Sequence, residues 1–152
     1  MNELKIPNHI GVIADGNRRW AREKGLKSID GHKAGVENIE KLFSYMIDCG
    51  VKVVSAYVFS TENFKRSSEE VKLLMDMAVN KFKTFSKKYN AENIKIIFSG
   101  KKTGLRSDVL EAMEVVAEKT KNNTRGTINF CFNYDGNEEI VDATKKICDD
   151  VN

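Results

Sequence analysis

The sequence lacks several features that would place the protein in other classes. It has a single proline, Pro7, so no proline-rich linker divides its 152 residues, a length that suits one compact domain. No apolar run approaches the roughly 20 residues of a membrane-spanning helix. The first residues also lack the apolar block of a signal peptide. We therefore expect one soluble, cytoplasmic domain over residues 1–152.

The cysteine spacing gives no support for a cysteine-ligated metal centre, and the net charge gives none for a nucleic-acid interface. Cys49, Cys131 and Cys148 lack the spacing of metal ligands. Two of them fall in apolar segments, which favours buried thiols in a reducing compartment. The formal net charge is only +3, too small to argue for nucleic acid. A phosphate site, however, needs only a few converging cations.

Apolar segments alternate along the chain with patterns of helical spacing. The predicted strands cover residues 10–14, 53–59, 94–98 and 128–132. The predicted helices cover residues 36–47, 67–89 and about 108–122, with a last helix beginning near residue 138. This alternation favours a single α/β domain with a mostly parallel sheet flanked by helices on both faces.

The first strand ends in a group of residues that indicates a ligand site. Asp15 and Gly16 follow the apolar run directly, and Arg18 and Arg19 come next. Ligands of open α/β sheets lie at the carboxyl ends of strands, where backbone N–H groups and a helix dipole favour anions. The pattern predicts that a divalent metal and a phosphorylated ligand meet here. A turn with a solvated ion pair is the alternative.

Polar clusters also follow later strands. The run from Ser60 to Ser67 ends the second strand, the segment Asp30–Gly35 encloses His32, and Asn133–Gly136 ends the last strand. Because the carboxyl ends of parallel strands share one edge, these clusters are expected to meet there. No Gly-x-Gly-x-x-Gly or Walker-type loop follows any strand, which argues against a nucleotide-binding module.

These segments together resemble the cis-prenyltransferases, the family of undecaprenyl and dehydrodolichyl diphosphate synthases. The matching residues are 9–20, 31–33, 59–66 and 133–136, in the family's order. The resemblance implies the family's fold, of which residues 1–152 cover the N-terminal two thirds. It also implies a Mg²⁺-dependent reaction, in which isopentenyl diphosphate condenses onto an allylic diphosphate such as farnesyl diphosphate.

The resemblance assigns roles residue by residue. Asp15 matches the essential, metal-binding aspartate. Asn63 matches a catalytic residue that removes a proton or positions isopentenyl diphosphate, and positioning is favoured because an amide is a poor base. The remaining matches are substrate-binding positions: Gly16, Asn17, Arg18, Arg19, Trp20, Ser28, His32, Ser60, Thr61, Glu62, Phe64 and Arg66.

Some positions depart from the family's pattern. Ser28 stands where the family usually has an arginine that faces the allylic diphosphate, and the adjacent Lys27 offers only a point charge on a different vector. Phe64 replaces a usual tryptophan and keeps a flat apolar wall. Asn137 replaces an arginine after Gly136.

The predicted helix over residues 67–89 has an apolar stripe with two interpretations. Its members are Val71, Leu74, Met75, Ala78, Phe82 and Phe85. Packing in the core is the default. The resemblance adds the other interpretation, a wall of the apolar tunnel that holds the growing prenyl chain.

Family members continue beyond this sequence into an Arg-x-Ser segment, which binds isopentenyl diphosphate and contributes to a dimer. The present sequence ends at Asn152 without it. One hypothesis is therefore a prenyltransferase that works as a homodimer, or with a full-length homologue, and delivers its product to a membrane. The other is a truncated, catalytically incompetent protein that binds prenyl diphosphates or serves as a dimer partner.

Overall fold

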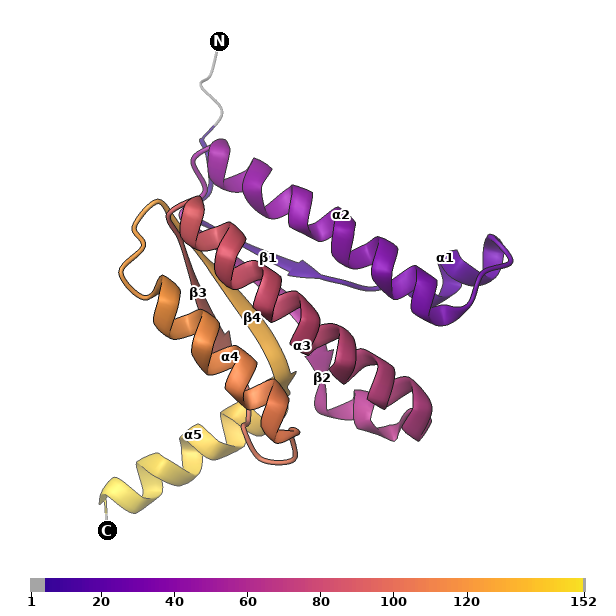
Figure 1. The fold of residues 1–152 in the computed structure, drawn as a ribbon. Coiled ribbons are helices and arrows are strands. Elements are labelled where there is room, and N and C mark those ends of the chain that lie inside the picture. Colours follow the sequence, from indigo (N-terminus) through magenta and orange to yellow (C-terminus); the bar gives the residue numbers. More distant parts are fainter. Residues whose placement is uncertain (1–4, 152) are drawn as a thin grey trace.

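The computed structural model describes residues 5–151, which form a four-stranded parallel sheet (Figure 1). The strands are β1 (His9–Ile13), β2 (Val53–Ser60), β3 (Ile94–Ser99) and β4 (Gly126–Tyr134). Their order across the sheet is β1-β2-β4-β3. The predicted α/β fold with a parallel sheet is confirmed, and each predicted strand is present within two residues of its expected bounds.

Residues 5–151 also form five helices and one short 3₁₀ turn, of which the last helix follows the last strand and the others lie between strands. These elements are α1 (Asn17–Glu23), α2 (Ser28–Asp48), the 3₁₀ turn η1 (Thr61–Lys65), α3 (Ser68–Ala91), α4 (Ser107–Thr120) and α5 (Gly136–Val151). Ser67 caps α3, because its hydroxyl accepts the Glu70 backbone N–H at 3.3 Å. Apolar spacing did not predict α1 or η1, since both are too short to show a helical period.

The core lies between the sheet and the helices α2, α3 and α4, which cover the same face (Figure 1). Aromatic rings fill its centre. The Phe130 ring on β4 stacks on Phe85 of α3 with ring centroids 5.5 Å apart. It also meets the edge of Phe43 from α2 at 5.6 Å. The two helices are thus held on the sheet by one group of phenylalanines.

The opposite face of the sheet carries no helix within residues 5–151, so the expectation of helices on both faces is wrong for this part of the chain. Polar side chains cross all four strands there. His9 Nε2 lies 2.8 Å from Ser55 Oγ. Asn129 donates to Ser55 at 3.1 Å and accepts from Ser99 at 3.0 Å. Because alternate strand positions are polar, this face lacks the continuous apolar surface that a helix would cover.

Two further expectations can be compared with the structure. The expectation of buried thiols is wrong for Cys49 and Cys148, which are exposed, whereas Cys131 is partly buried. Burial raises the pKa of the Cys131 thiol.

Within residues 5–151, no helix combines the length and apolarity needed to cross a membrane. Helix α5 leads away from the sheet and buries none of its residues (Figure 1).

Candidate active site

The chain turns sharply between β1 and α1 and leaves a carboxylate at the turn. Gly16 adopts a φ of 86°, which L side chains rarely allow, and caps α1. Its N–H donates to Asp15 Oδ1 at 2.5 Å, and Arg19 lies 3.5 Å from Asp15 Oδ2. The Asp15 side chain is 80% exposed. The carboxylate is therefore fixed in direction and open to a ligand.

Two glycines on α2 allow α1 to lie directly against it. A Cβ on Gly31 would stand 2.1 Å from the backbone oxygen of Asn17. A Cβ on Gly35, one turn later, would stand 2.4 Å from the Asn17 side-chain Oδ1. A side chain at Gly31 would collide with fixed backbone, whereas one at Gly35 would force the Asn17 amide to move. The sequence Gly-x-x-x-Gly on α2 thus positions Asn17 beside the end of β1.

A basic depression of about 910 Å³ opens around this turn. It is lined by Ala14, Asp15, Gly16, Asn17, Arg18, Arg19, Arg22, Gly25, Leu26, Lys27, Ser28, His32 and Arg66. Five of these side chains are arginine or lysine, and one is a carboxylate. Its chemistry suits an anion with several oxygens. Arg22 and Lys27 bring cations to the depression beside Ser28, where the expected arginine is missing.

One carboxylate holds three basic side chains of this region. Glu70 Oε1, on the first turn of α3, accepts from Arg66 at 3.1 Å. It lies 3.4 Å from His32 Nε2 and 3.7 Å from Arg18 Nε. Sequence reasoning assigned Glu70 only to the start of a helix. Its four-residue spacing from Arg66 is the signal that could have indicated a partner.

The surroundings of His32 favour its neutral form. Burial lowers the pKa of its imidazole below 6.5, and the nearby Arg66 and Arg18 act in the same direction. The hydrogen bond to Glu70 opposes this shift without overcoming it. The ring is therefore able to gain a proton when an anion binds beside it.

An apolar cavity of about 270 Å³ lies between α2, α3 and the sheet. Its apolar lining includes Val36, Ile39, Val58, Phe59, Leu74, Met77, Ala78, Phe82, Phe85, Phe130 and Phe132. Ala14, Asp15, Asn17, His32 and Arg66 line both the cavity and the basic depression. The two spaces therefore form one continuous site with a polar mouth and an apolar interior.

The apolar stripe of α3 is divided between the wall of the cavity and the core. Leu74, Phe82 and Phe85 line the cavity, whereas Met75 is 2% exposed and packs only in the core. The side of α3 that faces α2 and the sheet thus supplies the cavity wall, and the remaining buried positions hold the helix in place.

Ser60 and Asn63 fix each other at the end of β2. The Ser60 N–H donates to Asn63 Oδ1 at 3.2 Å, and the pair caps η1. Both residues line the apolar cavity. Because its oxygen accepts a backbone N–H, the Asn63 side chain is held in place beside the cavity.

Four other residues expected at the site line neither the depression nor the cavity. Trp20 is on α1 with its side chain exposed. The Thr61 hydroxyl donates to Asp135 at 3.1 Å. Glu62 accepts from Lys65 at 2.7 Å on the surface. The Phe64 ring packs on Phe59 with centroids 5.0 Å apart.

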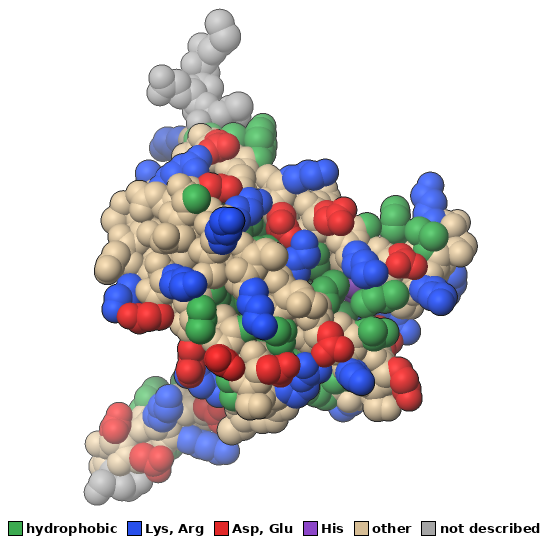
Figure 2. Space-filling view, viewed as in Figure 1, with side chains coloured by type: hydrophobic (Ala, Val, Ile, Leu, Met, Phe, Trp, Pro, Cys, Tyr) green, Lys and Arg blue, Asp and Glu red, His purple; other side chains and the backbone are tan. Residues whose placement is uncertain are grey.

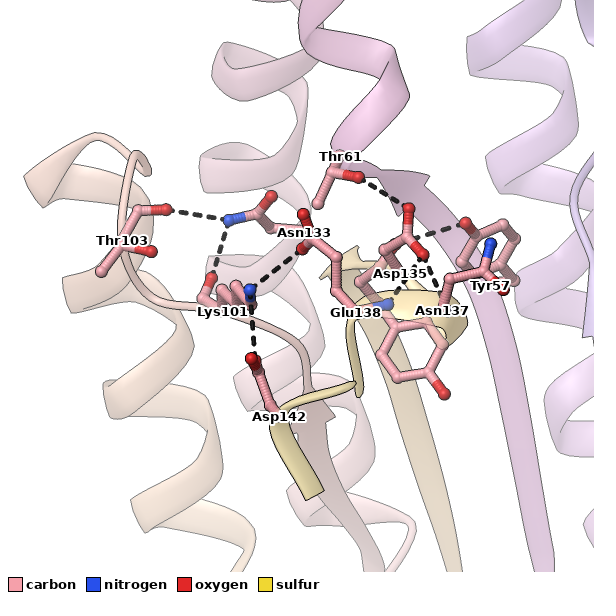
Figure 3. Close-up of polar contacts among 10 residues, drawn as sticks. Tyr57, Thr61, Lys101, Thr103, Asn133, Asp135, Asn137, Glu138 and Asp142 are labelled. Carbon is pink, nitrogen blue, oxygen red and sulfur yellow. Dashed lines mark hydrogen bonds and ion pairs between the residues drawn. The ribbon is translucent and has the colours of Figure 1, made fainter. Parts of the chain in front are cut away.

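The motif at the end of β4 ties strand ends together (Figure 3), and residues 133–136 line neither the cavity nor the depression. Asn133, at a φ of 53°, donates through Nδ2 to the backbone oxygens of Lys101 and Thr103 at 2.8 and 3.0 Å. Asp135 Oδ1 accepts the backbone N–H of Asn137 at 2.9 Å and so caps α5. Its other oxygen, Oδ2, accepts a hydrogen bond from the Thr61 hydroxyl. This motif therefore braces the edge that carries the site.

The donor set of the depression limits how a metal could bind. Within residues 5–151, no three His, Cys, Asp or Glu side chains cluster closely enough to hold a metal ion. Asp15 is the carboxylate of the depression. Mg²⁺ is commonly held by one or two carboxylates together with substrate phosphate oxygens. Asp15 therefore fits Mg²⁺ that arrives with a phosphorylated ligand.

Comparison with known proteins identifies the family. Residues 13–152 match the family model described as "Putative undecaprenyl diphosphate synthase". The chain belongs to the cis-prenyltransferase family. It is 42% identical over 147 residues to an isoprenyl transferase of Streptococcus mutans serotype c, covering 97% of this chain and 59% of that protein. An isoprenyl transferase of Thermotoga maritima is 40% identical, with 97% and 64% covered. The chain thus spans about three fifths of the length of these prenyltransferases.

Solved structures of cis-prenyltransferases share the fold. Lavandulyl diphosphate synthase from Lavandula x intermedia, in complex with dimethylallyl diphosphate, superposes with a TM-score of 0.92 at 29% identity. That alignment covers 96% of this chain and 63% of the other. A "probable undecaprenyl diphosphate synthase" from Campylobacter jejuni gives 0.78 at 27% identity, with 99% and 64% covered. The expected family and fold are therefore confirmed.

Proposed function

We propose that this cis-prenyltransferase condenses isopentenyl diphosphate onto an allylic diphosphate such as farnesyl diphosphate. The observation that carries the proposal is the continuity of the basic depression with the apolar cavity. A ligand that fills both must have a multiply charged head and an apolar tail, as a prenyl diphosphate has. A related protein of the same fold, lavandulyl diphosphate synthase, forms a complex with dimethylallyl diphosphate.

The head of the allylic substrate binds in the basic depression. Arg18, Arg19 and Arg66 present forked N–H donors that match diphosphate oxygens. Asp15 would hold Mg²⁺ together with the diphosphate, and the ion would neutralise charge that develops on the leaving group. The arginines serve the same purpose, because they stabilise the diphosphate as its bond to carbon breaks.

The apolar cavity holds the prenyl chain and excludes water. Phe59, Phe82 and Phe132 line it next to the mouth and the sheet. A cation-like allylic carbon survives only where water cannot attack it, so a dry wall beside the leaving group protects the reaction. Asn63 lines this cavity, and its amide would orient the incoming unit.

Turnover by the purified protein tests this proposal. Farnesyl diphosphate, labelled isopentenyl diphosphate and Mg²⁺ should give labelled, solvent-extractable product that EDTA abolishes. Asp15→Asn should lower the rate about 100-fold or more, because a metal ion supplies several kcal/mol of charge stabilisation. Asp30→Asn is the matched control, since Asp30 pairs with Lys33 on α2 and lines neither space.

Two results would contradict the proposal. Product formation by Asp15→Asn at the wild-type rate would remove Asp15 from the metal site. A folded protein that binds farnesyl diphosphate without turnover would be a binding-only or partner-dependent protein. The expected homodimer, the heterodimer with a full-length homologue and the cytoplasmic location remain predictions.

A further inference from the structure

Two polar bridges join α2 to α3 on either side of the apolar cavity. The first is the contact of His32 with Glu70 at the mouth. In the second, Lys81 Nζ donates to Glu40 Oε1 at 2.7 Å. Glu40 is about two turns beyond His32 on α2, and Lys81 is about three turns beyond Glu70 on α3. The Glu40–Lys81 bridge therefore spans the two helices deep along the cavity.

Lys81 belongs to the cavity wall as well as to the bridge. It is among the lining residues, while its ammonium group reaches Glu40. The side chains of Lys81 and Glu40 are only 31% and 18% exposed, so water screens this pair less than a surface pair. Acidic, basic and apolar side chains are mixed over this face of α2 and α3 (Figure 2). The aliphatic stem of Lys81 thus covers the cavity and its charge closes the gap between the helices.

The polar contacts continue along both helices beyond Lys81. Lys88 lies 3.9 Å from the other carboxylate oxygen of Glu40. Ser44 donates to Glu92 at 3.1 Å. These contacts hold the far ends of α2 and α3 together, on the side away from the mouth.

Aromatic rings close the interior of the cavity beneath this bridge. Phe85 stacks on Phe130, and both line the cavity. Behind Phe85 lies Tyr89, with ring centroids 5.3 Å apart. Tyr89 is fully buried, and its hydroxyl has no hydrogen-bond partner among the described residues. A prenyl chain that outgrows the cavity must therefore displace these rings or push α2 and α3 apart.

We propose that the Glu40–Lys81 bridge sets the longest prenyl chain that the cavity accepts, by holding α2 and α3 together over its far end. This inference rests on the proposed function, because it concerns the prenyl tail of the same substrate. The bridge adds the attraction of a part-buried charge pair to the apolar packing that already resists separation of the two helices.

Binding of prenyl diphosphates that differ by one isoprene unit tests the inference. Geranyl, farnesyl and geranylgeranyl diphosphate are titrated into the purified protein with Mg²⁺, and inorganic pyrophosphate reports the head site alone. Lys81→Met and Lys81→Glu should shift the ratio of Kd values toward the longer chain by roughly five-fold. The affinity for pyrophosphate should not change. Lys81→Arg, which keeps the pair, should retain the wild-type ratio.

Lys83→Met is the matched control, because Lys83 is an exposed lysine on the same helix that does not line the cavity. Thermal unfolding shows that each variant is folded. An unchanged chain-length ratio in both Lys81→Met and Lys81→Glu, with farnesyl diphosphate still bound, overturns the inference and leaves the proposed function intact. If the wild-type protein binds no prenyl diphosphate more tightly than pyrophosphate, the proposed function fails and the inference fails with it.

Discussion

Single residues at the mouth of the site are held by a shared carboxylate. Glu70 orients Arg66, Arg18 and His32, and its negative charge offsets the repulsion between the two arginines. The Glu70 side chain is only 19% exposed, so its contacts hold more firmly than a surface pair. The arginine donors are thereby pre-arranged for an anion. The repulsion between the arginines is offset during folding, so ligand binding does not have to overcome it.

The protonation of His32 gives a prediction at this scale. Burial lowers its pKa below 6.5, so between the folded pKa and 6.5 the unfolded chain binds a proton that the folded chain does not. His32 therefore lowers the free energy of unfolding as the pH falls through that window. A bound diphosphate favours the charged ring and reverses the shift. We expect uptake of up to about one proton at His32 on binding near pH 6.

Calorimetry in two buffers of different ionisation enthalpy measures this uptake. Because the diphosphate also titrates in this range, the comparison is with His32→Gln, which retains only the ligand's own contribution. Equal proton uptake by the wild-type protein and the variant would show that the ring does not respond to the ligand.

At the scale of elements, the packing of α1 depends on close contact with α2 as well as on apolar burial. Helix α1 has seven residues and lies against α2 where Gly31 and Gly35 leave space. The two glycines meet different parts of Asn17, the first its backbone and the second its side chain. Their substitution therefore separates the stability of the α1–α2 contact from the positioning of the Asn17 side chain.

We expect Gly31→Ala to lower the free energy of unfolding by about 1–3 kcal/mol, because the backbone of α1 must move. Gly35→Ala should stay within about 1 kcal/mol of the wild type, since the Asn17 amide can swing away and alanine favours the helix. It should nevertheless weaken diphosphate binding. Chemical denaturation and titration with farnesyl diphosphate measure the two effects. Gly11→Ala, with no atom within 4 Å of the new Cβ, is the control.

The opposite pattern would contradict the role given to these glycines. Gly31→Ala that is as stable as Gly11→Ala would mean that α1 is free to shift. Gly35→Ala that binds farnesyl diphosphate as tightly as the wild type would mean that the Asn17 side chain makes no contact with the ligand.

Sequence patterns predicted the long elements because their burial repeats along the chain. β2 and α3 each carry apolar residues at the period of their structure, and Ser67 marks the start of α3. The sequence also predicted Asp15, Arg18 and Arg66 at the site, because their motif follows strand ends. The four-residue spacing indicates the pairing of Glu70 with Arg66, but no local pattern records the contacts of Glu70 with Arg18 of α1 and His32 of α2.

At the scale of the molecule, a charged depression and an apolar cavity lie next to each other at the carboxyl ends of parallel strands. Strand order β1-β2-β4-β3 puts the ends of β1 and β2 side by side, so the turn after β1 meets η1 after β2. Helices α2 and α3 cover the same face of the sheet (Figure 1), and both line the apolar cavity. The bare second face of the sheet was not foreseen, because an apolar strand alone does not reveal which of its faces a helix covers.

The central claim is that one ligand occupies both spaces, with its diphosphate in the depression and its prenyl chain in the cavity. Calorimetric titration of farnesyl diphosphate and inorganic pyrophosphate, with Mg²⁺, tests it most directly in three proteins. These are the wild type, Arg18→Ala at the head site, and Ala78→Phe, which fills the cavity. We predict that Arg18→Ala weakens both ligands, whereas Ala78→Phe weakens farnesyl diphosphate alone. If Ala78→Phe leaves farnesyl diphosphate binding unchanged, the prenyl chain does not lie in this cavity and the account is wrong.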